Sequence, residues 1–505
     1  MNSLNRSNLL LLLSIIVCAC TSEQEVSKPN VLFIFTDDQT YTAVSTLGNP
    51  EVLTPNMDRL VNLGTSFTNA YNMGAWNGAV CAASRAMLIS GRSLWNVNEF
   101  RNKWKSGDSI ALSQTWPKLM EEAGYETYMS GKWHVDVPAE KVFQNVQHVR
   151  PGMPRDRWEH SKMVKLFDNE IANGDLTADE IMPLGYNRPL DETDTLWSPS
   201  DTTLSGFWQG GKHWSEVLRD DALDFLGRAQ ESDSPFFMYL AFNAPHDPRQ
   251  APMEFLDMYH LDELSLPASW QPQHPLKDPM GTGRRVRDEA LAPFPRTEYA
   301  TKVHLQEYYV SITHLDHQIG LILDRLEDLG MEENTYIIFT SDHGLAMGKH
   351  GLLGKQNLYE HSMKPPFVIV GPGIPKNRRV DTPIYLQDAM ATSLEIAGIP
   401  KPDFVEFNSV LGLADGSETK SFYEDGIYGG FIGYQRSIRK GNHKLIVIPA
   451  AKEIMLFDLK NDPEEMVDLS KDLDKKELIS VLFEDLEALQ IQFNDTLKLD
   501  PKHFL

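Results

Sequence analysis

Short apolar runs that end in charged or hydroxyl residues constrain the fold of this chain most strongly. Four such runs occupy residues 31–35, 125–129, 236–242 and 336–339. The first is continuously apolar, which is typical of a strand buried on both faces of a parallel sheet. Helical patterns lie between the runs, for example at 112–123, 214–229 and 303–329. Strands that alternate with helices predict an α/β fold with a large mixed, mostly parallel sheet flanked by helices.

Polar residues follow each of the four predicted strands. They are Asp37, Asp38, Lys132, His134, His246, Asp342 and His343. In parallel sheets ligands bind beyond the carboxyl ends of the strands, so we expect these residues to converge on one place. The three carboxylates suit a single hard cation such as Ca²⁺ or Mg²⁺.

Each of these residue types also has an ordinary structural role. Adjacent aspartates often cap the N-terminus of the next helix, and lysines are usually solvated. A lone histidine after a strand is more often structural. The convergence of Asp342 with the aspartate pair favours metal binding. Lys132 and Lys355 lie in glycine-bounded turns near strand ends, which favours a functional role for both.

A predicted helix at 80–90 contains the only cysteine beyond the first twenty residues. Cys81 opens this helix and Gly91 ends it. A helix N-terminus favours anions, and Arg85 lies on the same face as Cys81, four residues further on. Cationic and N–H groups therefore surround one sulfur. The alternative is a small buried cysteine in a core helix.

The first segment has the features of a bacterial export signal. Arg6 precedes an apolar run at 9–17 that is too short to span a bilayer. The sequence Val17-Cys18-Ala19-Cys20 resembles a lipobox, with cleavage before Cys20 and lipid on its sulfur. An ordinary cleaved signal or a plain anchor stays open. We expect an exported protein of the Gram-negative periplasm or outer membrane, with membrane contact only through this N-terminal lipid anchor.

Changes in composition divide the rest of the chain. Stretches at 135–212 and 260–298 are rich in proline and break the alternating pattern, and we interpret them as insertions over the rim of the sheet. The end of the chain predicts strands at 437–448 and 455–459 and a helix at 475–494. The predicted parts are a signal peptide at 1–20, a tether at 21–28, a main α/β domain at 29–405 and an α+β subdomain at 406–505.

The charge of the chain excludes one class of partner. Asp and Glu number 71 against 47 Lys and Arg, which gives a net charge of −24. General nucleic-acid binding needs a basic face and is therefore not expected. If the substrate is an anion, its pocket must be locally positive.

The helix motif carries a resemblance to a known family. Cys-x-Ala-x-Arg at 81–85, followed by Leu-Ile-Ser-Gly-Arg at 88–92, resembles the signature of the type I sulfatases. Further similar blocks occur in the family's order, namely 29–34 with Asp37 and Asp38, 131–134, Pro245-His246, 341–344, 354–360 and 456–465. The resemblance runs from about Pro29 to beyond Glu465, and it implies an alkaline-phosphatase-like fold with residues 29–405 as the catalytic domain.

The resemblance also implies a cofactor, a reaction and a partner. Cys81 would be oxidised to formylglycine by a maturation enzyme and would act as a hydrated aldehyde. Asp37, Asp38, Asp342, His343 and the modified Cys81 would bind Ca²⁺, with Mg²⁺ as the less favoured ion. The remaining site residues would be Arg85, Lys132, His134, His246 and Lys355. A sulfated saccharide is the expected substrate of an exported bacterial sulfatase.

Within that site the resemblance gives each residue a role. His134 would contact the formylglycine hydroxyl, and His246 would face the sulfate and the leaving oxygen. His246 or Lys355 would protonate the leaving alcohol. Arg85, Lys132 and Lys355 would supply positive charge to the sulfuryl oxygens.

Two other functions stay open at this point. An alkaline-phosphatase-like phosphoester or phosphonate hydrolase usually has Thr or Ser as nucleophile and two zinc ions, which the Cys-x-Ala-x-Arg motif argues against. A non-catalytic lipoprotein that binds sulfated glycans is disfavoured because the lysines, histidines and carboxylates of the family pattern are all present.

Overall fold

The computed structural model describes most of the chain. The described residues are 28–154, 178–292 and 294–504, together with Lys162, Lys165, Leu166, Asn169, Asn173 and Gly174. The predicted signal peptide, including Cys18 and Cys20, lies outside the described residues. No helix in the described part of the chain is both long and apolar enough to cross a membrane.

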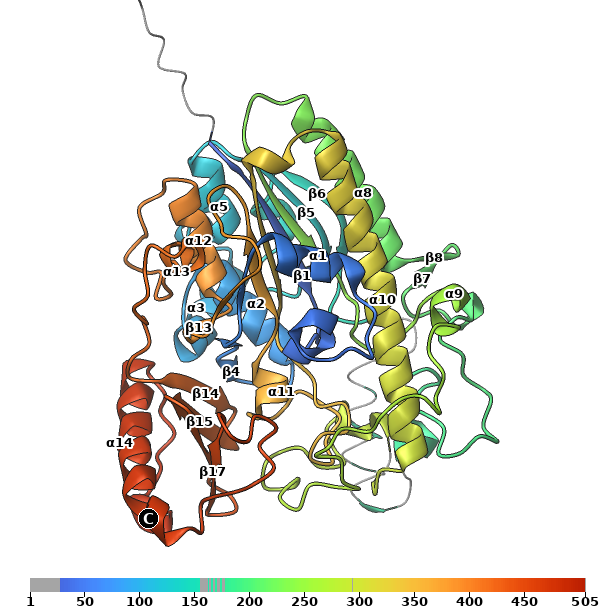
Figure 1. Ribbon diagram of the computed structural model, residues 1–505, viewed down its shortest axis with the longest axis vertical. Helices are drawn as coiled ribbons and strands as arrows, with labels where there is room; N and C mark the ends of the chain where they lie inside the picture. The colour runs from blue at the N-terminus through green and yellow to red at the C-terminus, as the bar shows by residue number, and fades with distance from the viewer. Residues whose placement is uncertain are drawn as a thin grey trace, which may run out of the picture.

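An eight-stranded sheet forms the centre of the molecule (Figure 1). Its order is β12 (Arg378–Val380), β2 (Thr65–Phe67), β11 (Phe367–Val370), β10 (Thr335–Ser341), β1 (Asn30–Thr36), β9 (Phe236–Ala241), β5 (Glu126–Lys132) and β6 (Asn145–Arg150). The five strands from β10 to β6 are mutually parallel, and β11 runs antiparallel to β10. The prediction of a mixed, mostly parallel sheet is confirmed.

Both faces of the sheet are covered, which explains the continuous apolar run of β1. Val31, Phe33 and Phe35 point into one hydrophobic core, whereas Leu32 and Ile34 point into the other. This alternation follows from the twofold repeat of a strand. The helices against the first core are α2 (Val80–Ser90), α3 (Leu94–Ser106), α5 (Trp116–Glu122) and α12 (Asp388–Ile396). Those against the second are α1 (Pro55–Leu63), α8 (Trp214–Gln230) and α10 (Glu298–Asp328).

One predicted helix is two helices. The pattern at 112–123 divides between α4 (Ser109–Ser113) and α5, and Pro117 lies in the first turn of α5. Proline has no N–H to continue a helix and favours the first turn of a new one. A new helix therefore begins at Trp116, although the apolar pattern of the sequence continues without a break.

A second sheet of five strands lies beside the main one. Its order is β17 (Glu453–Asp458), β16 (His443–Ile448), β15 (Gln435–Lys440), β14 (Ile427–Phe431) and β4 (Gly74–Ala75), and α14 (Lys476–Gln492) packs against it. The predicted strand region at 437–448 is a hairpin of two strands. β4 comes from far earlier in the chain and pairs in parallel with β14. The C-terminal sheet is therefore completed by the segment that leads into α2.

Where the structure describes them, the two predicted insertions are mostly irregular. The stretch at 260–298 holds one 3₁₀ turn, Glu289–Leu291, before α10 begins. The stretch at 135–212 also contains β6, which is an edge strand of the main sheet. β6 is half-buried and its sequence has no continuous apolar run, which is why the pattern does not predict it.

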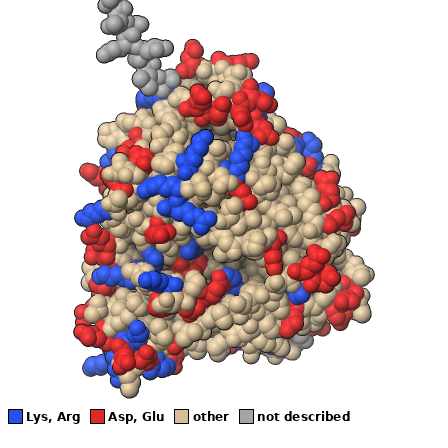
Figure 2. Space-filling view, in the orientation of Figure 1, with Lys and Arg blue, Asp and Glu red and all other residues tan. Residues whose placement is uncertain are grey.

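The two ends of the main sheet differ in character. The described chain begins with Lys28, next to the start of β1, so the first residues lie at the amino end of the parallel strands (Figure 1). Acidic side chains gather at this upper end in Figure 2, where α10 finishes with Asp324, Glu327 and Asp328. The carboxyl ends of the strands, where ligands are expected, lie away from it.

Candidate functional site

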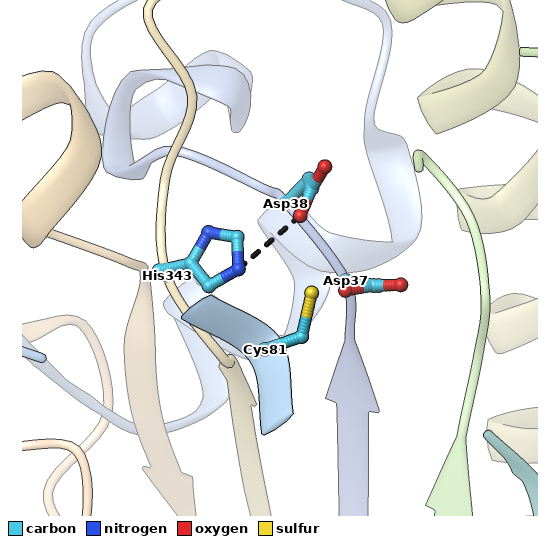
Figure 3. A group of neighbouring side chains, drawn as sticks. All are labelled: Asp37, Asp38, Cys81 and His343. Atoms are coloured by element: carbon cyan, nitrogen blue, oxygen red, sulfur yellow. Dashed lines mark ion pairs between the residues drawn. The ribbon is translucent and has the colours of Figure 1, made fainter. Parts of the chain in front are cut away.

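Residues from four strands and one helix meet beyond the carboxyl ends of the parallel strands. β1 leads to Asp37 and Asp38, β5 to Lys132 and His134, β9 to His246, and β10 to Asp342 and His343. The N-terminus of α2 brings Cys81 to the same place (Figure 3). The ten residues predicted for the site lie in one connected cluster, and nine of them are buried, since only His134 is partly exposed.

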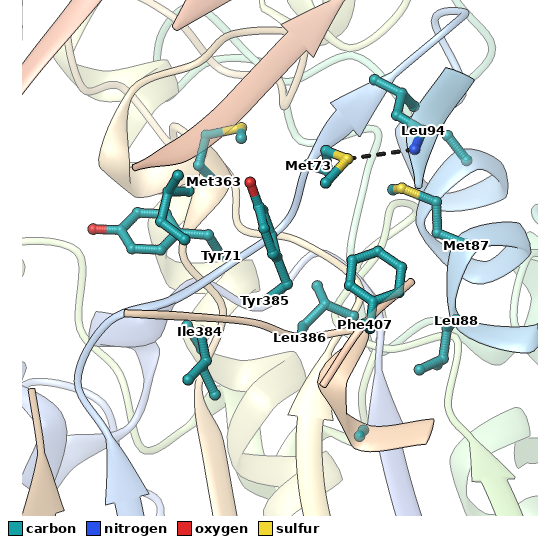
Figure 4. Close-up of a cluster of buried hydrophobic side chains, with 14 of the residues drawn as sticks. Tyr71, Met73, Met87, Leu88, Leu94, Met363, Ile384, Tyr385, Leu386 and Phe407 are labelled. Carbon is teal, nitrogen blue, oxygen red and sulfur yellow. Dashed lines mark hydrogen bonds between the residues drawn. The ribbon is translucent and has the colours of Figure 1, made fainter. Parts of the chain in front are cut away.

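α2 is held by packing on both sides of its signature motif. Met87 and Leu88 pack into a cluster with Met73, Tyr385 and Phe407 (Figure 4). Gly91 ends the helix in the left-handed conformation with φ of 66°, as the sequence predicts. Because this buried end is fixed, the first turn with Cys81 is presented to the strand ends.

The turn after β1 fixes the two aspartates. Asp38 has a left-handed backbone with φ of 68°, which is unusual for a residue other than glycine. Its N–H donates to Asp342 Oδ1 at 3.1 Å, and its carbonyl accepts a hydrogen bond from the Tyr308 hydroxyl at 2.7 Å. The main chain of Asp38 is therefore held by side chains from two other elements.

Four potential metal ligands lie close together. Asp37, Asp38, Cys81 and His343 each place a ligand atom within 4.8 Å of the others (Figure 3). His343 Nδ1 is 2.9 Å from the Gly344 carbonyl oxygen and donates to it, which turns Nε2 toward the carboxylates. Burial opposes charge on this imidazole, but Asp342 and Asp38 raise its pKa. His343 Nε2 is 3.3 Å from Asp38 Oδ1.

Asp342 lies at the edge of this group. Its Oδ1 is 3.5 Å from His343 Nε2, and its Oδ2 accepts a hydrogen bond from Arg85 Nε at 3.0 Å. Burial works against charge on Asp342, but His343 and Arg85 lower the pKa of its carboxyl to about 2. Asp342 is therefore ionised at neutral pH.

The donor set fits a divalent cation. Asp37 Oδ1 and His343 Nε2 are buried, and neither has a hydrogen-bond partner among the described residues. Burial, followed by the charge of Asp342, raises the pKa of Asp37 well above its usual range. A cation between the carboxylates would relieve both the unpaired atoms and the repulsion.

Three basic side chains surround the acidic group. Lys132 forms an ion pair with Asp37, and Arg85 Nη1 donates to the Lys132 carbonyl at 2.9 Å. Lys355 Nζ is 2.8 Å from Asp38 Oδ1 and 3.2 Å from Cys81 Sγ. All three side chains are buried, so their charges act with little screening by water.

This surrounding charge activates the sulfur of Cys81. Burial alone would raise the pKa of the thiol, but Lys132 and Lys355 hold it well below its usual range. His134 and His246 lower the pKa of the thiol further. The position is thus built for an anionic or nucleophilic group.

The two histidines are each held in a fixed orientation. His246 Nδ1 donates to the Asp247 carbonyl at 2.7 Å, which leaves Nε2 facing Asp38 Oδ2 at 3.9 Å. Gly152 packs against the His134 ring, since a Cβ at residue 152 would lie 2.6 Å from His134 Cε1. Burial lowers the pKa of His134, so its imidazole is neutral at pH 7.

Sequence reasoning missed a chain of charges behind His246 and Lys355. Arg287 forms ion pairs with both Asp247 and Asp288. Asp288 lies 3.9 Å from Lys355 Nζ and accepts a hydrogen bond from Gln356 Nε2 at 2.6 Å. The basic run at 284–287 and the position of Asp247 beside His246 were the available signals, but neither specifies the pairing.

Comparison with known proteins gives a consistent picture. The profile described as Sulfatase matches residues 29–399, and that described as N-sulphoglucosamine sulphohydrolase, C-terminal, matches residues 348–492. An arylsulfatase of Clostridium perfringens is 29% identical over 498 residues, covering 94% of this chain and 97% of the relative. An N-acetylglucosamine-6-O-sulfatase of Bacteroides thetaiotaomicron is 25% identical, covering 97% and 92%.

Solved structures share the fold. The structure of BT4656 in complex with its substrate D-glucosamine-2-N,6-O-disulfate has a TM-score of 0.67 at 23% identity and covers 93% of this chain and 99% of that chain. A phosphonate monoester hydrolase of Agrobacterium radiobacter has a TM-score of 0.68 at 20% identity, covering 92% and 96%. Because the fold is common to both chemistries, the reaction has to be argued from the site.

Proposed function

We propose that this chain, which belongs to the sulfatase family and is a sulfuric ester hydrolase, removes sulfate from a sulfated saccharide through a formylglycine made from Cys81. The observation that carries the proposal is the position of Cys81. It opens α2 against Lys355, with Asp37 and Asp38 nearby, and His134 and His246 help to lower the pKa of its thiol. The carbohydrate sulfatases among the relatives support the saccharide.

The modification supplies a nucleophile that the cysteine lacks. As a hydrated aldehyde, formylglycine provides one hydroxyl to attack sulfur and a second to release the sulfate afterwards. The lone buried thiol of Cys81 is the sole cysteine in the described part of the chain. Its conversion needs a maturation enzyme, which we propose as a partner of this protein.

We propose Asp37, Asp38, Asp342 and His343 as the protein ligands of one divalent cation. We favour Ca²⁺ over Mg²⁺ because three carboxylates are available and Ca²⁺ accepts flexible coordination, whereas Mg²⁺ demands near-ideal octahedral geometry. When bound, the ion would supply positive charge to the nucleophile and to the sulfuryl oxygens.

The chain's own residues would bind the sulfate and move the protons. Arg85, Lys132 and Lys355 present positive charge toward residue 81. His246 turns Nε2 toward the centre, and as an imidazolium with a proton on that nitrogen it would protonate the leaving alcohol, with Lys355 as the other candidate. His134, held neutral by burial, is suited to accept a proton from residue 81.

Sulfate release tests the reaction class. The purified protein, co-expressed with a maturation enzyme, should release sulfate from 4-methylumbelliferyl sulfate far faster than phosphate from the matching phosphate. Peptide mass spectrometry should show a loss of about 18 Da at residue 81, the thiol-to-aldehyde change on which the nucleophile depends. Faster phosphate release, or full activity with unmodified Cys81, would overturn the proposal.

We also propose export and lipid anchoring through Cys20. The support is the basic, apolar and cysteine-bearing pattern at 6–20. Cell fractionation should place the protein in the membrane fraction, and Cys20→Ala should shift it to the soluble periplasmic fraction. An unchanged distribution would contradict the anchor.

A further inference from the structure

Arg249 differs from the other deeply buried arginines of the described chain. Four arginines are among its largest fully buried side chains. Three of them have a carboxylate partner, namely Asp342 for Arg85, Glu307 for Arg188 and Asp495 for Arg436. Arg249 is 2% exposed and has no carboxylate oxygen of a described residue within 4.0 Å. A buried charge without a counter-charge is unfavourable, so this guanidinium needs an explanation.

The contacts of Arg249 leave most of its donors free. Its Nη1 is 3.1 Å from His304 Nδ1, while His304 Nε2 is 3.0 Å from the Leu291 carbonyl oxygen and donates to it. His304 is therefore a neutral acceptor. Neither Nε nor Nη2 of Arg249 forms a hydrogen bond with a described residue, and Nε is fully buried.

The acidic groups around Arg249 already have partners. Glu307 pairs with Arg188 through Oε2 and accepts from Trp197 Nε1 through Oε1 at 2.7 Å. Asp247 pairs with Arg287 through both oxygens. The unused donors of Arg249 therefore have no oxyanion of the described chain available to them.

Arg249 stands beside the reaction centre. It follows His246 by three residues, and its guanidinium carbon is 5.7 Å from the centre of the Tyr308 ring. The Tyr308 hydroxyl in turn bonds to the Asp38 carbonyl. Gln250 ties the segment to a neighbouring loop, because its Oε1 accepts from Phe207 N at 2.7 Å and its Nε2 donates to the Ser205 carbonyl at 3.0 Å. The backbone beside Arg249 is thus anchored through Gln250, and the guanidinium itself is positioned by its contact with His304.

We propose that Arg249 binds a second oxyanion of the substrate saccharide, either a carboxylate or another sulfate, beside the sulfate that is cleaved. A guanidinium offers parallel N–H donors that match both groups. A local unpaired positive charge also overcomes the repulsion that a chain of net charge −24 exerts on an anionic ligand. The inference rests on the proposed function, and it makes the substrate a saccharide with at least two negative groups.

Matched pairs of saccharides test this assignment. The first pair is N-acetylglucosamine 6-sulfate and glucosamine N,6-disulfate, and the second is methyl glucoside 2-sulfate and methyl glucuronide 2-sulfate. Binding by calorimetry and kcat/KM are measured for each pair with the matured protein and with Arg249→Gln. Arg92→Gln is the control, because Arg92 is a buried arginine that bonds to Gln114 and Ser90 on the far end of α2.

The unmutated protein should prefer the doubly anionic member of at least one pair by about 10- to 100-fold, the size of a charge-assisted contact. Arg249→Gln should abolish that preference through a raised Kd and KM, while Arg92→Gln should keep it. A preference in the first pair would identify the second oxyanion as a sulfate, and a preference in the second pair would identify it as a carboxylate.

The outcomes separate the two proposals. No preference in either pair, or equal weakening of both members by Arg249→Gln, would overturn the role of Arg249. Absence of sulfate release from every compound would instead overturn the proposed function, and the binding measurements would still decide whether Arg249 recognises the second oxyanion.

Discussion

Two buried clusters of charged side chains in this molecule are built in opposite ways. The seam cluster, formed by Glu360, Lys444, Glu465 and Tyr71, joins α11 (Glu360–Met363) to the C-terminal sheet. Lys444 Nζ is 3.0 Å from Glu360 Oε1 and 2.9 Å from Glu465 Oε1, and the Tyr71 hydroxyl donates to Glu360 Oε2 at 2.8 Å. The site cluster around Cys81 instead brings four potential metal ligands together, and Asp37 Oδ1 and His343 Nε2 have no hydrogen-bond partner among the described residues.

The difference separates stability from function. The seam cluster places one lysine between two carboxylates, and burial raises the pKa of Glu465 to about 7. It holds two parts of the fold together without a ligand. The site cluster gathers carboxylates that repel one another although Arg85, Lys132 and Lys355 lie beside them, and the cation proposed above would relieve that repulsion. Mutations in the first should lower stability, whereas mutations in the second should lower activity and leave stability nearly unchanged.

Removal of the sulfur should give the largest effect on activity. Cys81→Ala should lower kcat by about ten-thousandfold or more, because no other group in the site replaces the nucleophile. Its melting temperature should stay within about 2 °C of the unmutated protein, since one atom is lost from a site held by other contacts. Paired turnover and thermal unfolding measurements check this, and an active variant would remove Cys81 from the mechanism.

Loss of one carboxylate should come next. Asp37→Asn should reduce turnover by about a thousandfold, because the counter-charge of a bound cation is removed. Stability should be unchanged or higher in the metal-free protein, because repulsion with Asp342 is relieved. Chelation, verified by metal analysis, should reproduce the activity loss in the unmutated enzyme, and full activity without metal would contradict the cation site.

The seam cluster should respond in the opposite sense. Lys444→Met removes the cation shared by two buried carboxyl groups, of which only Glu360 keeps an ion pair among the described residues, with Lys364 at 3.9 Å. The variant should lower the free energy of unfolding by about 3 kcal/mol. The kcat of the folded fraction should stay within about threefold of normal, since Lys444 touches no site residue.

The control for this variant is Lys471→Met, which removes an exposed ion pair with Glu453 and should change stability little. Urea unfolding of the two variants side by side gives the result. Equal losses of stability would show that the seam cluster is no more important than a surface pair.

The leaving-group side of the site cluster offers a finer test. His246→Ala should reduce turnover of a sulfated saccharide by about a hundredfold but that of 4-nitrophenyl sulfate by less than about tenfold, because a sugar alcohol needs a proton and 4-nitrophenolate does not. Lys355→Ala should be assayed in parallel on both substrates. Equal losses for His246→Ala would leave His246 as a sulfate contact rather than the acid.

A buried histidine pair outside both clusters should give the smallest effect. His213 and His314 pack edge to face with ring centres 4.9 Å apart, and burial lowers the pKa of His213 to about 3 and that of His314 well below its usual range. The unfolded chain takes up protons near pH 6.5 that the folded chain does not. Stability should therefore fall below pH 6.5, by about 1.4 kcal/mol per pH unit for each histidine.

Urea unfolding at pH 7 and pH 5.5 measures this dependence. His213→Asn keeps an acceptor for Ser215 N–H at the start of α8 and removes one titrating group, so its stability should fall less steeply with acid. An identical slope in the variant would show that His213 makes no contribution.

The sequence predicts the strands and the polar residues at their ends because both signals are local. The apolar run of β1 and the aspartates after it are adjacent in the chain, and so are Cys81 and Arg85 on α2. The parallel arrangement then brings Asp342 to Asp37 and Asp38 across a separation of some three hundred residues, as expected from the fold class.

Long-range pairing through irregular segments could not be predicted in the same way. Arg287 pairs with Asp247 across a loop whose sequence has no repeating pattern. Arg284, Arg285 and Arg287 lie close together in the chain, so the sequence does not show which of them forms the pair. β4 joins the C-terminal sheet with only two residues, too few for an alternating pattern. The isolation of Arg249 depends on which acids are already paired, and that is a property of the packed structure alone.

The start of β1 is a suitable site for attaching the protein to a support. Lys28 lies two residues before the seven-residue strand β1, which is about 23 Å long at 3.3 Å per residue, and the reaction centre lies beyond its carboxyl end. A bead, an electrode or a fused carrier protein attached ahead of Lys28 would therefore contact the amino end of the parallel strands, on the side opposite the reaction centre. Long polymers could approach the opposite end unobstructed, which makes this terminus the place to couple the protein in an immobilised reactor.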